Sequence, residues 1–214
     1  MFEKILIAED FNSYNFAIMK FLEELKIPSI NQVYYCDDAL LQIRKSYAEQ
    51  KPYQLLITDL FFKIDRPVNI ESGEELIIKI KQEFPEVKIL VFSVENKLYK
   101  INSLFDNYNI DGFVEKGRGD IKILKEAMYE IFNGKKWTNL NEKYIIKWEV
   151  NDIEIVKLVS KGYSVKIISQ TFKKLNYMPN SESYINKRLM VMREDMGAKN
   201  TTELVLLFIN EGLL

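Results

Sequence analysis

The sequence predicts an α/β fold, a doubly wound five-stranded parallel sheet, followed by a small all-α domain. Over the first 132 residues, short apolar runs alternate with segments of helical periodicity. From residue 151 onward the strand pattern is gone and only helical periodicity remains. Several apolar runs also end in acidic or other polar side chains, as strands do where a sheet carries a site.

The expected strands and helices of the first domain follow directly from these patterns. The apolar runs predict strands at 4–8, 32–36, 54–58, 87–92 and 111–115. The amphipathic segments predict helices at 12–26, 38–48, 72–83, 96–107 and 119–132. Strands that alternate with helices pair in parallel through right-handed crossovers, so helices are expected on both faces of the sheet.

The C-terminal segment is expected to form four short helices. The first ends before Gly162, and the second begins near Val165. Ser181 can cap the third, with Gly197 as its C-terminal stop, and Asn200 can open the fourth. We therefore expect one domain at 1–132, a linker at 133–150 that carries two tryptophans, and a helical domain at 151–214.

The composition excludes several classes of site. The chain has 214 residues with a single cysteine and no histidine, which rules out an internal disulfide, the usual hydrolase triads and most zinc sites. No apolar run approaches the roughly 18 residues of a membrane span, and no signal peptide is evident, so a cytoplasmic protein without membrane contact is expected. Net charge is −1, which divides into −3 for residues 1–138 and +2 for residues 139–214.

Polar residues follow four of the expected strands. Glu9 and Asp10 follow the first, Asp59 the third, Ser93 the fourth and Lys116 the fifth. Because the carboxyl ends of parallel strands meet at one edge, these side chains are expected to converge. Carboxylate oxygens, with a backbone carbonyl at Phe61, suit Mg²⁺.

This set of groups also suits phosphoryl transfer. A carboxylate beside a metal ion can attack phosphorus, because the metal neutralises charge on the transferring group. An ammonium group such as that of Lys116 can pair with the new phosphoryl oxygens, and the Ser93 hydroxyl can donate a hydrogen bond to one of them.

The residues Glu9–Asp10, Asp59, Ser93 and Lys116 resemble the receiver domain of bacterial two-component response regulators, a flavodoxin/CheY-like fold. The resemblance covers about residues 1–132. It implies that Asp59 is the phosphoacceptor, that Glu9 and Asp10 hold Mg²⁺, and that Ser93 and Lys116 are the switch hydroxyl and the phosphate-pairing lysine. Phe113 falls near the family's switch aromatic and equally fits plain core. One departure is visible, because the expected glycine, Gly73, comes fourteen residues after Asp59 instead of about eight.

The C-terminal domain resembles the LuxR-type helix-turn-helix of NarL/FixJ-like regulators, through residues 153–164 and 196–205. In such a domain the helix after Ser181 enters the DNA major groove. Its candidate DNA contacts are Asn186, Lys187, Arg188 and Arg193. The alternative is a solvated helix face, since Glu194 and Asp195 would repel phosphate. The turn at 173–180 is also longer than usual.

These features predict a response regulator that is not an enzyme. A sensor histidine kinase would phosphorylate Asp59, and a homodimer would then bind double-stranded DNA and regulate transcription. The alternative is a phosphorylation-controlled signalling adaptor whose C-terminal helices bind a protein. A metal-dependent phosphatase is disfavoured, because no base for turnover is evident.

Overall fold

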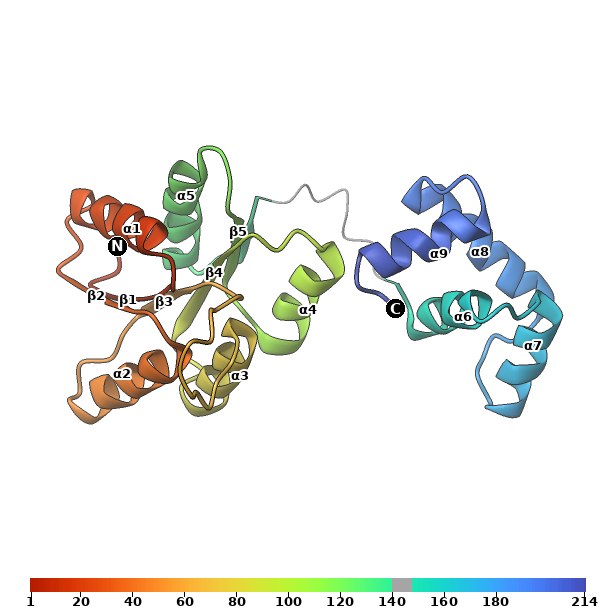
Figure 1. Ribbon diagram of the computed structural model, residues 1–214, viewed down its shortest axis with the longest axis horizontal. Helices are drawn as coiled ribbons and strands as arrows, with labels where there is room; N and C mark the ends of the chain where they lie inside the picture. The colour runs from red at the N-terminus through yellow and green to blue at the C-terminus, as the bar shows by residue number, and fades with distance from the viewer. Residues whose placement is uncertain (140–147) are drawn as a thin grey trace. The chain divides into compact units, whose positions relative to one another are not determined.

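A computed structural model describes residues 1–139 and 148–214, apart from the side chains of residues 98 and 99. The chain divides into two compact units, an N-terminal α/β unit and a C-terminal helical unit, and each has its own hydrophobic core. Of the expected linker at 133–150, residues 140–147 lie outside the described part. Figure 1 shows the order of the elements along the chain.

The α/β unit is built on a parallel sheet with strand order β2-β1-β3-β4-β5-β6. Its strands are β1 (Lys4–Ala8), β2 (Ser29–Val33), β3 (Leu55–Thr58), β4 (Lys88–Ser93), β5 (Gly112–Glu115) and β6 (Trp137–Thr138). Four of the five expected strands lie within one residue of their expected bounds.

Two features of the sheet differ from the expectation. The sequence places the second strand at 32–36, whereas β2 spans Ser29–Val33 and Cys36 already begins a helix. The prediction is wrong because β2 lies on an edge of the sheet and its outward residues are polar. A sixth short strand, β6, adds to the edge formed by β5, within the segment expected to be linker. Trp137 packs there against the core of the sheet.

Helices cover both faces of the sheet (Figure 1). One face packs against α1 (Asn12–Glu24) and α5 (Asp120–Phe132). The other packs against α2 (Cys36–Ala48), α3 (Gly73–Glu83) and α4 (Leu98–Tyr108). Neighbouring residues of a strand face opposite ways. Ile5 and Ile7 therefore join the core cluster beneath α1 and α5, and Leu6 joins the core cluster beneath α2, α3 and α4. Burial on both faces explains why the central strands are nearly continuous apolar runs.

In the described part of the C-terminal unit, four helices surround one apolar cluster. They are α6 (Val150–Ser160), α7 (Val165–Lys174), α8 (Glu182–Met196) and α9 (Thr201–Asn210). The caps expected from the sequence are present. Ser181 accepts a hydrogen bond from the backbone of Tyr184, Asn200 accepts one from Glu203, and Gly197 ends α8 in the left-handed conformation.

None of the described helices is both long enough and apolar enough to cross a membrane.

Candidate functional site

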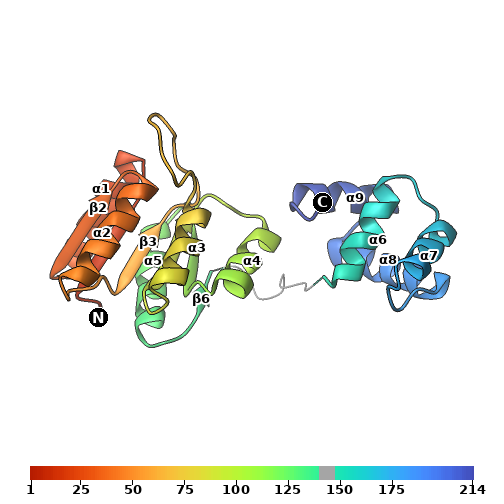
Figure 2. The same ribbon diagram turned by 90° about the horizontal axis from the view of Figure 1, so that it is seen from below.

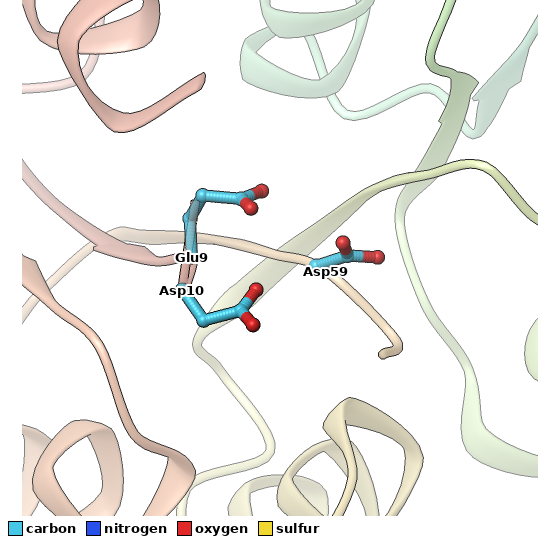
Figure 3. Close-up of side chains that lie close together, drawn as sticks. All are labelled: Glu9, Asp10 and Asp59. Carbon is cyan, nitrogen blue, oxygen red and sulfur yellow. The ribbon is translucent and has the colours of Figure 1, made fainter. Parts of the chain in front are cut away.

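Three carboxylates meet at the carboxyl ends of two neighbouring strands. Glu9 and Asp10 directly follow β1, and Asp59 directly follows β3, which pairs with β1. Each residue offers one carboxylate oxygen, and these oxygens all lie within 4.8 Å of one another. Figure 3 shows the three side chains projecting from the adjacent strand ends. Glu9 is 1% exposed and Asp59 is 4% exposed, so two of the three acids lie almost out of water.

Lys116 places a positive charge directly against this cluster. It follows β5, and its backbone N–H donates to the Ser93 carbonyl at 2.7 Å. Its ammonium Nζ lies 2.5 Å from Asp59 Oδ2 and 2.7 Å from Glu9 Oε2, and it sits 4.4 Å from the centroid of the Tyr14 ring. One buried cation therefore bridges two of the three carboxylates.

Burial raises the pKa of the Glu9 carboxyl above its ordinary value, although the hydrogen bond and the charge of Lys116 act in the opposite direction. The negative charge of Asp59 adds to the increase. A second cation would relieve this excess of negative charge.

The donor set fits a hard divalent cation such as Mg²⁺. Asp10 Oδ2 accepts a hydrogen bond from the Lys63 backbone N–H at 2.8 Å, whereas Asp10 Oδ1 is buried without a hydrogen-bond partner among the described residues. An oxygen in that position is suited to a metal ligand, because an orphaned buried acceptor is costly. Asp59 Oδ1 accepts hydrogen bonds from the N–H groups of Leu60 and Phe61, so its orientation is fixed as well. The liganding role of the Phe61 carbonyl stays a prediction.

Ser93 and Phe113 have well-defined places in the sheet. Ser93 ends β4, between β3 and β5, and is completely buried. Its Oγ accepts a hydrogen bond from the Glu95 N–H at 3.4 Å. Phe113 is the second residue of β5 and is completely buried in the core cluster beneath α2, α3 and α4. It is therefore core in this structure, and its role as a switch stays a prediction.

The long segment after Asp59 leaves the site intact. Gly73 begins α3 directly against the Asp59 backbone, and a Cβ built on it would lie 1.8 Å from the Asp59 carbonyl oxygen. Phe61 and Ser72 form an isolated antiparallel bridge. Residues 62–71, which include the added length, leave from this bridge as a loop that we call the strap. It is visible in Figure 2 as the extended gold segment between β3 and α3.

In the helical unit, the expected DNA contacts on α8 differ in exposure and in their partners. Asn186 and Lys187 are exposed. Arg193 is partly buried and donates from Nε to the Leu189 carbonyl at 3.3 Å. Arg188 instead forms a two-point ion pair with Asp152, at 2.6 Å for each hydrogen bond.

This pairing holds Arg188 within the helical unit, and its contact with DNA stays a prediction. Because Asp152 is 0% exposed, the negative charge of its carboxylate needs a cation within the helical unit. Asp152 also accepts a hydrogen bond from the Glu149 N–H at the start of α6. Sequence reasoning missed Asp152. Its signal was an acidic residue at the third position of a helix that opens with Glu149, the pattern of a capping box.

Comparisons with known proteins bear on the whole chain. No protein-family model matches it, and no curated protein matches it. Solved structures do match. An RcsB–DNA complex is 25% identical and covers 98% of each chain, with a TM-score of 0.61. Two isolated receiver domains also match, each with a TM-score of 0.53. That of RcsB from Salmonella enterica serovar Typhimurium, with the phosphomimetic BeF₃⁻, is 26% identical and covers 65% of this chain and 95% of its own. The receiver domain of RcsB from Escherichia coli, in its non-phosphorylated form, is 28% identical and covers 64% of this chain and 98% of its own.

These neighbours confirm the fold class and the expected resemblance to two-component response regulators of the NarL/FixJ-like kind. The parallel α/β unit corresponds to a receiver domain and the helical unit to a helix-turn-helix domain.

Proposed function

We propose that this chain, which has the fold of a response regulator of the NarL/FixJ-like kind, accepts a phosphoryl group on Asp59 and regulates transcription by binding DNA. The observation that carries the proposal is the placement of Asp59. Its carboxylate is held by Lys116 and lies within 4.8 Å of the carboxylate oxygens of Glu9 and Asp10. A strongly oriented carboxylate beside a cation site is what a phosphoryl acceptor needs.

The proposed donor is a phosphohistidine of a sensor histidine kinase. This chain contains no histidine, so in such a transfer it can act only on the aspartate side. An Asp59 oxygen forms the new O–P bond while the N–P bond of the phosphohistidine breaks. The electron pair of that bond returns to the imidazole nitrogen. Bound Mg²⁺ would neutralise charge on the transferring group. We place the protein in the cytoplasm, where the kinase domain and the DNA are both accessible.

After transfer, Lys116 and Ser93 hold the phosphoryl group. The Lys116 ammonium is already 2.5 Å from Asp59 and can pair with a phosphoryl oxygen. Ser93 Oγ accepts a hydrogen bond from Glu95, so its own hydrogen can be donated to another phosphoryl oxygen. When Ser93 moves to donate this hydrogen bond, the start of the segment that leads to α4 moves with it. Transfer happens once per chain without turnover, so the protein acts as a switch and not as an enzyme.

The DNA-binding half of the proposal rests on α8. Asn186 can form two hydrogen bonds with adenine, and Lys187 can contact phosphate or guanine. Both are exposed on the same helix, whereas Arg188 is committed to Asp152. The solved RcsB–DNA complex, to which the chain is similar over nearly its whole length, supports this assignment. We propose that a homodimer binds two half-sites.

One observation favours the alternative of a protein-binding adaptor. With Arg188 neutralised by Asp152, the remaining charges of α8 are two basic residues and three acidic ones, Glu182, Glu194 and Asp195. That balance is poor for a helix that approaches phosphate. An adaptor would use the same exposed face to bind a protein.

The test uses the full chain with fragmented genomic DNA, with and without beryllofluoride and Mg²⁺, followed by sequencing of the retained fragments. We expect enriched sites, with stronger enrichment when beryllofluoride is present. Asp59→Asn is expected to lose phosphoryl uptake from a phosphorylated kinase, measured by intact mass. Undiminished uptake would reject Asp59 as the acceptor. Absence of enrichment in both states, from folded protein, would support the adaptor.

A further inference from the structure

The strap, residues 62–71, is fixed at both of its ends. The bridge between Phe61 and Ser72 closes it. Next to the bridge, Phe62 packs against the core cluster beneath α2 and α3, and Ile70 is buried in that cluster. The strap is thus anchored to the core immediately after the proposed phosphoacceptor.

The middle of the strap is tied to the start of α2. Three contacts do this: Tyr35 Oη donates to Asp65 Oδ1 at 2.7 Å, Arg66 pairs with Asp38 at 2.8 Å, and the Asn69 N–H donates to Asp37 Oδ2 at 2.8 Å. The Arg66 guanidinium also lies 3.6 Å from the centroid of the Tyr35 ring. These contacts hold the strap in a defined conformation across its length.

One atom of the strap reaches the acidic cluster. The Lys63 backbone N–H donates to Asp10 Oδ2 at 2.8 Å, across 53 residues of sequence. The other oxygen of the same carboxylate, Oδ1, is buried and lacks a hydrogen-bond partner within the described ranges. The hydrogen bond therefore fixes the rotation of the Asp10 carboxyl group and leaves Oδ1 as the oxygen that can accept a cation.

We propose that the strap is a positioning element for the divalent cation of this site, acting through the Lys63 amide on Asp10. The proposal rests on the metal role given to Glu9, Asp10 and Asp59 above. Groups that hydrogen-bond a metal ligand fix its orientation, and their loss typically weakens metal affinity by about 10- to 100-fold. The amide and the cation take different oxygens of Asp10, so the strap supports metal binding and does not compete with it.

The test is a titration of the full chain with MgCl₂, by isothermal titration calorimetry and by the Mg²⁺-dependent rise in Tm. Lys63→Pro removes the N–H, and we expect Mg²⁺ affinity to fall by about 10- to 100-fold. Lys63→Ala keeps the N–H and is expected to retain wild-type affinity. The rate of phosphorylation by acetyl phosphate should need more Mg²⁺ in Lys63→Pro and recover at saturation. Cooperative unfolding of the variant by urea without Mg²⁺ would show that it is folded.

Arg66→Ala provides a second, milder test that leaves the Lys63 amide in place. It releases the strap from Asp38 and Tyr35, and we expect a loss of Mg²⁺ affinity of about two- to fivefold, as suits an exposed ion pair. If Lys63→Pro fails to fold, unchanged Mg²⁺ affinity in Arg66→Ala overturns the proposal.

The outcomes separate this inference from the proposed function. Wild-type or stronger Mg²⁺ affinity in Lys63→Pro overturns the positioning role, while the wild-type chain still takes up a phosphoryl group. A wild-type chain that binds no Mg²⁺ and takes up no phosphoryl group overturns the metal site itself.

Discussion

Lys116 determines the charge balance of the acidic cluster at the level of single residues. Its side chain is 2% exposed and contacts two carboxylates that are themselves buried. Without it, Glu9 and Asp59 would face each other and Asp10 without the two ion pairs that now balance their charge. Removal of one partner from a buried ion pair costs about 3–5 kcal/mol, because the remaining charge is left uncompensated.

Lys116→Met is therefore expected to lower the free energy of unfolding by about 3–5 kcal/mol in the absence of Mg²⁺. Added Mg²⁺ should restore part of this loss by binding only the folded state, and more so than in the wild type. Urea unfolding with and without Mg²⁺ measures both effects. Lys122→Met, at an exposed position of α5, is the matched control. Equal stability of Lys116→Met and the control would show that the carboxylates do not need this cation.

Tyr53 gives a residue-scale prediction on pH. It is 3% exposed, its hydroxyl donates to Asn31 Oδ1 at 2.9 Å, and burial raises its pKa above the ordinary value of 10.0, with a further contribution from Glu49. Above pH 10 the unfolded chain therefore loses this proton before the folded chain does. The folded state then binds more protons, so stability falls as pH rises through this range.

The decline in the free energy of unfolding above pH 10 should be shallower in Tyr53→Phe than in the wild type. Urea unfolding at a series of alkaline pH values measures the two slopes. Parallel slopes would mean that Tyr53 does not contribute to the decline.

At the residue scale, the sequence was informative where the strand pattern fixed the position of a polar residue. Glu9, Asp59 and Lys116 could be expected to converge, because each comes directly after an apolar run. Arg188 and Lys187 are adjacent in one helix, and periodicity could not tell that Asp152, 36 residues before Arg188, would hold one of them. The contribution of the Lys63 backbone amide could not be predicted either, since it depends on the path of the strap.

At the level of elements, the pair Arg188–Asp152 joins α8 to α6. Asp152 lies in the first turn of α6, where it also receives the Glu149 N–H, so the ion pair fixes the start of one helix against the middle of another. Arg188 is 24% exposed, and its guanidinium donates two hydrogen bonds to the same carboxylate. This arrangement fixes the position of the helix that is proposed to read DNA.

Substitutions at neighbouring residues of α8 should separate structure from recognition. Arg188→Ala is expected to destabilise the helical unit by about 3–5 kcal/mol, because Asp152 is left buried and unpaired. Lys187→Ala should change stability by less than about 0.5 kcal/mol and weaken DNA binding. Thermal unfolding and DNA affinity of the two variants provide the measurements. If the Arg188→Ala variant is as stable as the wild type but loses DNA binding, Arg188 contacts DNA directly.

The elements themselves were predicted with uneven success, for a physical reason. Buried central strands such as β1, β3 and β4 are continuous apolar runs and stand out in the sequence. The edge strand β2 has exposed polar residues and was misplaced by three residues at its start. β6 has only two residues, and its pairing with β5 depends on how Trp137 packs, which no local pattern reveals.

At the scale of the whole chain, the N-terminal and C-terminal parts carry small net charges of opposite sign. Residues 139–214 carry a net charge of +2 against −3 for residues 1–138. Within the helical unit, the exposed basic side chains of α7 and α8 are Lys166, Lys173, Lys174 and Lys187. The sequence alone predicted this modest excess, but only the structure removes Arg188 from the exposed set.

This charge distribution predicts a shallow dependence of DNA affinity on salt. If the phosphate contacts come from two to four of these lysines, log K should fall with log[salt] with a slope of about −2 to −4 per chain, close to −0.9 for each neutralised phosphate. Fluorescence anisotropy with a retained genomic fragment at several salt concentrations measures the slope. Lys187→Ala should reduce its magnitude by about 1, whereas Lys199→Ala, near the start of α9, should leave it unchanged. An affinity independent of salt would mean that the exposed lysines do not contact phosphate, and it would favour a protein as the partner of α8.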